Sequence, residues 1–294
     1  MTARIAVVAN SKKLSKKDGG ELRHELESRG LTDILWIGVD KASDTTKAVK
    51  RALKDGAERI IVSGGDGSVR AGIEALVGTD IPMAVMPAGT ANLFATGLNL
   101  PTDAAGVAEA AQAGNLRRLD TGTCNGLAFG VMAGTGFDAM MIEEADADKE
   151  RLGTLAYVRA GLKASRERKP FQAKVKLDGD IFFDGEATCV LVGNLGTLKG
   201  GIEAFPDAQP NDGLLDVAVV TASGMREWGS VMLSALRRKQ SLSGHAHLGQ
   251  GSAISVRLDG QQTFELDGGA KGRAKRLDFT VEPASLLVCT LAAA

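Results

Sequence analysis

The hydrophobic and polar residues follow one repeating pattern through the first 120 residues of the chain. Short apolar runs rich in valine and isoleucine alternate with segments in which apolar residues recur every three or four positions. The first pattern is typical of buried strands and the second of amphipathic helices. The predicted strands are 5–9, 34–39, 59–62 and 82–86, and the predicted helices are 20–29, 45–54, 68–76, 91–97 and 103–113. Strict alternation predicts a doubly wound α/β domain with a parallel sheet covered on both faces.

The pattern changes after residue 120, where short predicted strands follow one another with few helices between them. The predicted strands are 127–132, 171–177, 181–183, 187–192, 215–220, 253–258, 263–266, 277–281 and 286–290. Two helices, 148–163 and 225–241, interrupt them. This pattern indicates an antiparallel β-sandwich or barrel. We therefore divide the chain into an α/β domain, 1–120, and a β-sandwich domain, 121–294, and expect the active site in the cleft between them.

A glycine-rich turn follows the strand 59–62 and reads Gly64-Gly65-Asp66-Gly67-Ser68. Glycines let the backbone turn tightly and approach a ligand without a Cβ clash. The amides of such a turn, together with the start of the next helix, form a seat for phosphate. An ordinary strand-to-helix turn is the alternative interpretation.

A second polar turn, with Gly89, Thr90 and Asn92, follows the strand 82–86. In a doubly wound sheet, ligands bind beyond the carboxyl ends of the strands. The two turns therefore predict one binding site at that edge of the sheet.

The pair Gly-Gly-Asp-Gly-Ser and Gly-Thr-Ala-Asn resembles the diacylglycerol kinase catalytic domain family. That family includes bacterial lipid kinases and the sphingosine and ceramide kinases, and it shares its nucleotide fold with NAD kinases. The resemblance implies an ATP- and Mg²⁺-dependent kinase of phospholipid biosynthesis that phosphorylates a lipid hydroxyl, with diacylglycerol as the default acceptor. Phosphoryl transfer needs mainly positioning and charge neutralisation from the protein.

The resemblance also assigns roles to individual residues. Those expected to contact the nucleotide are Asn10, Gly64, Gly65, Asp66, Gly67, Ser68, Gly89 and Thr90. Asp66 and Asp120 are expected in a network of magnesium and water, and Asp267 is the expected general base. Two alternatives stay open: Asp120 as a turn residue at a strand end, and Asp267 as part of an Asp-Gly hairpin turn.

A third loop, Pro210–Asp216, matches the family's structural-metal loop. Asp212, with the carbonyls of Gln209 and Leu214, would hold Mg²⁺ or Ca²⁺. The alternative is an Asn-Asp-Gly turn without metal.

Two residues depart from the family pattern, because Gly269 and Leu93 stand where many members have carboxylates. These departures leave open an altered mechanism, weak activity, or a regulatory protein that binds nucleotide without catalysis. An NAD kinase is a further alternative. It is disfavoured because Val69 and Arg70 follow the first loop and the chain shows no Asn-Glu pair of the sort that holds the ribose.

The composition bears on the binding partners of the protein and on its cellular compartment. A formal net charge of -1 argues against nucleic acid as a partner. Three scattered cysteines without a CxxC pair suit a reducing cytoplasm. No apolar segment approaches the roughly 20 residues that span a bilayer. We therefore expect a cytoplasmic enzyme that meets its lipid peripherally at the membrane surface. The oligomeric state stays open, and a homodimer is one arrangement.

One predicted helix is a candidate for contact with the membrane surface. In the predicted helix 225–241, Met225, Trp228, Met232 and Leu236 recur at helical spacing beside Arg237 and Arg238. This stripe is either an interfacial surface or the core face of the helix.

Overall fold

The computed structural model describes residues 4–136, 170–196, 203–236 and 244–292. The chain forms two compact units, one of Met1–Thr121 with Pro283–Ala294 and one of Gly122–Glu282. Each unit is described by itself. The predicted division at residue 120 assigns the C-terminal segment to the second domain, whereas residues 283–294 group with the first unit. The predicted helix 148–163 lies outside the described residues.

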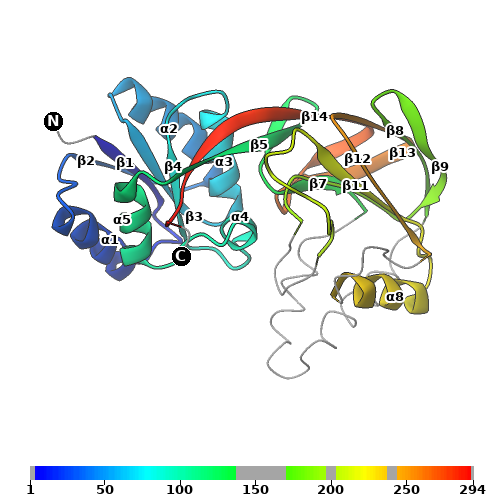
Figure 1. The fold of residues 1–294 in the computed structure, drawn as a ribbon, viewed down its shortest axis with the longest axis horizontal. Coiled ribbons are helices and arrows are strands. Elements are labelled where there is room, and N and C mark those ends of the chain that lie inside the picture. The colour runs from blue at the N-terminus through cyan, green and yellow to red at the C-terminus, as the bar shows by residue number, and fades with distance from the viewer. Residues whose placement is uncertain (1–3, 137–169, 197–202, 237–243, 293–294) are drawn as a thin grey trace. The chain divides into compact units, whose positions relative to one another are not determined.

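The first unit is the α/β domain that the alternating pattern predicts (Figure 1). Its elements are β1 (Ile5–Asn10), α1 (Lys16–Ser28), β2 (Ile34–Val39), the short 3₁₀ helix η1 (Ala42–Asp44), α2 (Thr45–Lys54), β3 (Arg59–Gly64), α3 (Asp66–Leu76), β4 (Met83–Pro87), α4 (Leu93–Gly97) and α5 (Ala104–Ala113). The strands lie in the order β4-β3-β1-β2 and are all parallel. The end of β14 (Gly269–Cys289) continues this parallel arrangement, with Val288 paired to Met83.

The central strands are hydrophobic on both faces because helices cover both faces of the sheet. Every residue of β1 is buried. Helix α1 begins at Ser15, whose Oγ accepts the N–H of Asp18 at 3.1 Å. Helix α5 begins at Asp103, which accepts the N–H of Gly106 at 2.9 Å. Helical caps of this kind satisfy amides that have no partner within the helix.

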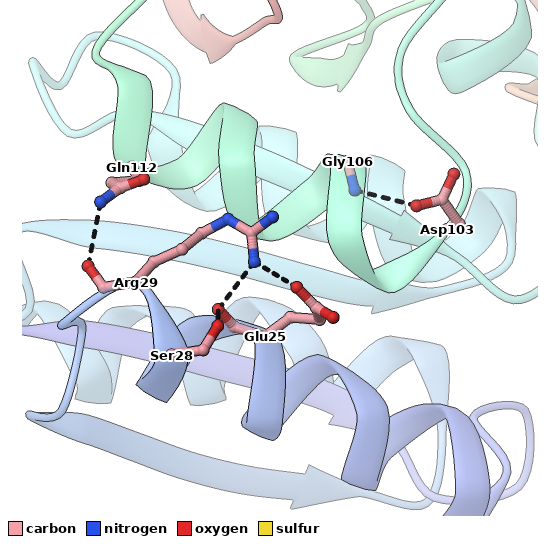
Figure 2. Close-up of polar contacts among 6 residues, drawn as sticks. All are labelled: Glu25, Ser28, Arg29, Asp103, Gly106 and Gln112. Carbon is pink, nitrogen blue, oxygen red and sulfur yellow. Dashed lines mark hydrogen bonds and ion pairs between the residues drawn. The ribbon is translucent and has the colours of Figure 1, made fainter.

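Helices α1 and α5 lie side by side, and a polar contact joins their ends (Figure 2). The Nε2 of Gln112 donates to the carbonyl of Arg29 at 2.9 Å. The guanidinium of Arg29 turns back to the carbonyl and carboxylate of Glu25. Leu22 and Leu26 pack into a core with the sheet and with four alanines of α5: Ala104, Ala108, Ala110 and Ala111.

The second unit is the antiparallel β domain that the short strands after residue 120 predict. Its elements are the end of β5 (Leu116–Cys124), β6 (Leu127–Phe129), β7 (Met132–Thr135), β8 (Phe171–Leu177), β9 (Asp180–Ala187), β10 (Cys189–Gly193), β11 (Leu215–Val220), α8 (Met225–Leu236), β12 (Ala246–Gly251), β13 (Ala253–Leu266) and most of β14. Neighbouring strands pair in antiparallel register, for example β10 with β11 and β13 with β14. Phe129 and Phe279 meet edge to face in its core, with ring centroids 6.4 Å apart.

Helix α8 buries one side of its surface. Trp228, a member of the predicted stripe, is only 3% exposed, and Val231 and Ala235 are buried as well. The side chains of Met225, Met232 and Leu236 lie outside the described ones, so the membrane-surface alternative stays open. Among the helices that the structure describes, none has the length and apolar character needed to cross a bilayer.

Candidate active site

The first glycine loop lies at the carboxyl end of β3. Helix α3 starts immediately after Gly65, its N-cap residue, which has no side chain that could cap the helix. A Cβ atom on Gly64 would lie 2.6 Å from the Oγ of Ser68 and 3.4 Å from the Cβ of Asn10. Only glycine fits at this crowded point. The predicted nucleotide residues Asn10, Gly64 and Ser68 are therefore neighbours in the folded chain.

The second glycine loop follows β4, the strand next to β3, and the two loops touch through their backbones. A Cβ atom on Gly65 would lie 3.3 Å from the Cα of Gly89. Thr90, beside this contact, is exposed to solvent. The structure thus brings both predicted phosphate loops to one edge of the sheet, as the sequence pattern implies.

Asp66 joins the two loops. Its Oδ1 accepts the N–H of Leu93 at 2.6 Å, and its Oδ2 accepts the N–H of Asn92 at 3.1 Å. Asn92 in turn exchanges two hydrogen bonds of 2.9 Å with the backbone of Gly89 and lies in the left-handed region at φ 51°. Both carboxylate oxygens of Asp66 therefore hold the start of α4. The predicted role of Asp66 at magnesium stays a prediction.

Asn10 ends β1 and is 7% exposed. Its Oδ1 accepts the N–H of Lys12 at 3.1 Å, and its carbonyl accepts the amides of Lys13 and Leu14. This side chain therefore shapes the turn that carries the two exposed lysines past the first loop.

Asp120 lies elsewhere in the first unit. Its Oδ1 accepts the N–H of Ala284 at 2.7 Å, and the carbonyl of the next residue, Ser285, accepts the N–H of Gly78. Gly78 follows the end of α3, whereas the glycine loop precedes its start. An 11-residue helix is about 16 Å long. These contacts connect Asp120 to the C-terminal end of α3, and its predicted role in a network of magnesium and water stays a prediction.

Asp267, in the second unit, forms the turn between β13 and β14 at φ 45°. Its carboxylate is 4% exposed and accepts three backbone N–H groups. Oδ2 accepts that of Gly130 at 2.9 Å, and Oδ1 accepts those of Val131 and Met132 at 2.8 and 3.0 Å. Successive amides that converge on an oxygen form a typical anion nest. The hairpin-turn alternative holds for the backbone of Asp267, and its role as a base stays a prediction.

The predicted metal loop is a turn on the surface of the second unit. Gln209 and Asp212 are exposed, and the Oδ1 of Asp212 accepts the N–H of Leu214 at 2.9 Å. Within the part of the chain that the structure describes, no three His, Cys, Asp or Glu side chains are arranged to bind one metal ion. A site here would therefore need carbonyl ligands, as the prediction has it.

Asp216 adds a feature to this loop that the sequence reasoning did not single out. Burial raises the pKa of Asp216 to about 6, and the carboxylates of Asp212 and Asp207 raise it further, against a hydrogen bond from Gln250. Among the described residues these carboxylates are not arranged as three ligands of one ion, so the pKa of Asp216 alone does not indicate a cation. The metal loop stays a prediction, and the oxygen ligands that it names would suit Mg²⁺ or Ca²⁺.

Two family models match the chain. Residues 4–124 match the diacylglycerol kinase catalytic domain, which contains both glycine loops. Residues 131–290, more than half of the chain, match the YegS C-terminal NAD kinase beta sandwich-like domain. The chain belongs to the proteins that join a diacylglycerol kinase catalytic domain to a YegS C-terminal NAD kinase beta sandwich-like domain. The family explains the order of the two units, with the α/β domain first and the β-sandwich second.

Relatives in this family come from several bacteria. A diacylglycerol kinase of Staphylococcus saprophyticus is 26% identical over 281 residues, which cover 93% of this chain and 91% of that protein. A diacylglycerol kinase of Mycobacterium tuberculosis is 32% identical over 66% of this chain and 64% of its own length. An uncharacterized protein of Synechocystis is 32% identical over 78% of this chain and 55% of its own length. The chain thus spans less than two thirds of the last two relatives.

Solved structures show the same fold at lower identity. A diacylglycerol kinase from Bacillus anthracis superimposes with a TM-score of 0.75 at 19% identity, over 99% of this chain and 97% of that chain. An NAD kinase from Archaeoglobus fulgidus in complex with ATP gives 0.57 at 11% identity, over 98% and 93%. The architecture of this family therefore extends to NAD kinases.

Proposed function

We propose that this protein transfers the γ-phosphoryl group of ATP to the hydroxyl of a lipid, with diacylglycerol as the acceptor, at the surface of a membrane. The observation that carries the proposal is the contact between the two glycine loops, Gly65 against Gly89, at the start of α3, where the N-cap residue is a glycine. Backbone amides at a helix start stabilise phosphate without a bulky side chain. The family of the chain and the ATP-bound fold relative support the choice of nucleotide.

In this reaction the acceptor oxygen forms a bond to the γ-phosphorus while the bond from phosphorus to the ADP oxygen breaks. The proton of the hydroxyl passes to a carboxylate, for which we propose Asp267. The amides that hold Asp267 fix its direction toward one hydroxyl, and because they also favour its charged form they oppose the uptake of a proton. Mg²⁺ bound with the nucleotide would supply positive charge to the phosphates.

A regulatory nucleotide-binding protein is the second candidate function. Leu93, at a position where many relatives in the family carry a carboxylate, is 3% exposed and belongs to the packed interior. Gly269 offers no side chain beside Asp267. Both features reduce the number of carboxylates available for proton transfer and magnesium, and they favour weak or absent catalysis.

The deciding experiment is a phosphorylation assay with radiolabelled ATP and mixed micelles that contain diacylglycerol, run beside ceramide, sphingosine and NAD. The matched variant is Asp267→Asn, and binding of ADP is measured in parallel. Labelled phosphatidic acid, lost in the variant, supports the lipid kinase. Bound ADP without any labelled product supports the regulatory protein, and labelled NADP supports an NAD kinase. Absence of both nucleotide binding and product overturns the proposal.

A further inference from the structure

Asp66 is placed to act on the second glycine loop. Both of its carboxylate oxygens accept amides at the start of α4, at 2.6 Å from Leu93 and 3.1 Å from Asn92. These partners lie 27 and 26 residues away in the sequence. We propose that Asp66 is a positioning residue that fastens the second glycine loop to the first, so that one rigid seat receives the nucleotide phosphates. This inference rests on the proposed nucleotide site.

The local chemistry explains why a carboxylate stands at this position. Helix α4 has five residues, Leu93–Gly97, and its preceding residue Asn92 makes no side-chain cap. Its first amides therefore need an acceptor from elsewhere in the chain. Asp66 supplies two oxygens at once, and charge-assisted hydrogen bonds are short and strong. An asparagine could accept only one of the two amides, because its NH₂ group is a donor.

The same contacts decide which amides remain for phosphate. The N–H groups of Asn92 and Leu93 are directed to Asp66, and the N–H of Gly89 is directed to the Oδ1 of Asn92 at 2.9 Å. These three donors stabilise the loop itself. In the turn 64–68 the N–H of Ser68 likewise donates to the carbonyl of Gly65, at 2.9 Å, so phosphate would be bound by other amides of the two loops.

A positioning role and a magnesium-ligand role predict opposite effects on ADP affinity in the absence of metal when the Asp66 carboxylate is removed. If Asp66 were only a metal ligand, its removal would take a negative charge away from the phosphates. ADP would then bind as well or better without metal, and more Mg²⁺ would be needed for half-maximal effect. If Asp66 positions the loop, its removal weakens ADP binding equally with and without metal.

The experiment measures ADP affinity by calorimetry, in EDTA and across a Mg²⁺ titration, for wild type, Asp66→Asn and Asn92→Gly. The second variant removes the two hydrogen bonds between the Asn92 side chain and the Gly89 backbone within the second loop and keeps every carboxylate, and glycine tolerates the left-handed conformation at 92. Asp44→Asn is the control, because Asp44 lies on η1 beside α3 and makes no capping bond. Hydrogen exchange of the peptide 88–95 reports the loop directly.

We expect ADP affinity about tenfold lower in both variants, the size of one lost charge-assisted contact, with and without metal. The Mg²⁺ requirement should be unchanged, and the amides of Asn92 and Leu93 should exchange faster in Asp66→Asn. The control should match wild type. Unchanged or tighter metal-free ADP binding in Asp66→Asn, or a raised Mg²⁺ requirement, overturns the inference while the nucleotide site stands. If Asp66→Asn does not fold by circular dichroism, Asp66→Ser, whose hydroxyl oxygen can accept one of the two amides, takes its place in the same measurements. A wild type that binds no ADP overturns both the inference and the proposed function.

Discussion

Gly89 lies so close to Gly65 that a Cβ atom on Gly89 would come within 2.6 Å of the Gly65 Cα. Real Cβ atoms do not approach a backbone carbon this closely, so any side chain at residue 89 must push the two loops apart. Because these loops follow adjacent parallel strands, their separation sets the width of the proposed phosphate seat.

Gly89→Ala should therefore weaken nucleotide binding. Forcing a methyl group into a packed contact typically costs about 1–3 kcal/mol, which corresponds to about a tenfold loss of affinity or more. Calorimetric titration with ADP measures the loss. Gly20→Ala in α1, where nothing lies within 4 Å of the added Cβ, is the control and should bind as wild type does. Equal affinities in the two variants would show that the loop contact does not shape the site.

Asp267→Asn should affect stability as well as turnover. The asparagine NH₂ group would face a backbone N–H that now donates to the carboxylate, and an unsatisfied buried group costs about 1–3 kcal/mol. If Asp267 is the base, turnover of the folded protein should also fall about 10²–10⁴-fold. Urea unfolding gives the first effect, and rates corrected for the folded fraction give the second. A stability loss without a rate loss would leave Asp267 a purely structural residue.

The metal loop is tested by ligand-linked stability. Mg²⁺ or Ca²⁺ at a hundred times its Kd should stabilise the wild type by about 2.7 kcal/mol, because the ion binds only the folded state. Asp212→Ala should abolish this gain, whereas Asp180→Ala, an exposed aspartate of the same unit, should keep it. Thermal midpoints in EDTA and in excess metal give the answer. If all three proteins respond alike, the ion binds at a different place.

Gly269→Glu should restore a carboxylate that the family pattern has. A Cβ atom at residue 269 would meet nothing closer than the carbonyl of Leu266 at 3.5 Å and the Nζ of Lys271 at 3.8 Å, so the variant should fold. We expect lipid phosphorylation to rise, by up to about 10²-fold if the new carboxylate takes part in proton transfer. Gly269→Gln, of the same size without the charge, is the control. A glutamate variant no faster than the glutamine variant contradicts the idea.

The cysteines should be inert in the native protein. Burial raises the pKa of Cys124 to about 12 and that of Cys289 to about 11, and Cys189 is buried too. Because the thiolate is the reactive form, a higher pKa leaves less of it at pH 8. A colorimetric thiol reagent at pH 8 should therefore titrate no thiol within minutes in buffer and all three in denaturant. Rapid native reaction at Cys124 would indicate local opening of β5.

Elements whose pattern is local could be predicted from the sequence. The bounds of β2, α2, β8 and β11 match the predicted ranges, because each has a clear apolar period and flanking turn residues. Among the described strands, β5 and β12 were missed: β5 starts with the exposed Leu116-Arg117-Arg118, and β12 contains two glycines, so neither shows a hydrophobic pattern. The predicted strand 127–132 covers β6 but only the first residue of β7. Strands β13 and β14 each continue through polar stretches that the predicted strands leave out. Hydrogen bonds to neighbouring strands keep these stretches extended.

Some features of the candidate site could likewise be predicted from the sequence, and others could not. The glycine loops are visible in the sequence because the residue types themselves are unusual. The amide partners of Asp66 and Asp267 are not, because they come from positions up to 137 residues away and are backbone groups that every residue carries. The raised pKa of Asp216 likewise depends on burial and on Asp207 across a loop, neither of which a motif encodes.

The grouping of residues 283–294 with the first unit has a consequence for how the chain is made. Val288 pairs with Met83, the carbonyl of Ser285 accepts the N–H of Gly78, and Thr290 donates to the carbonyl of Asn115. A ribosome therefore releases the whole β-sandwich before the parallel sheet receives its last strand. Until then β4 has an open edge, which is a template for pairing with other chains. The nucleotide half, although it is synthesised first, should be completed last.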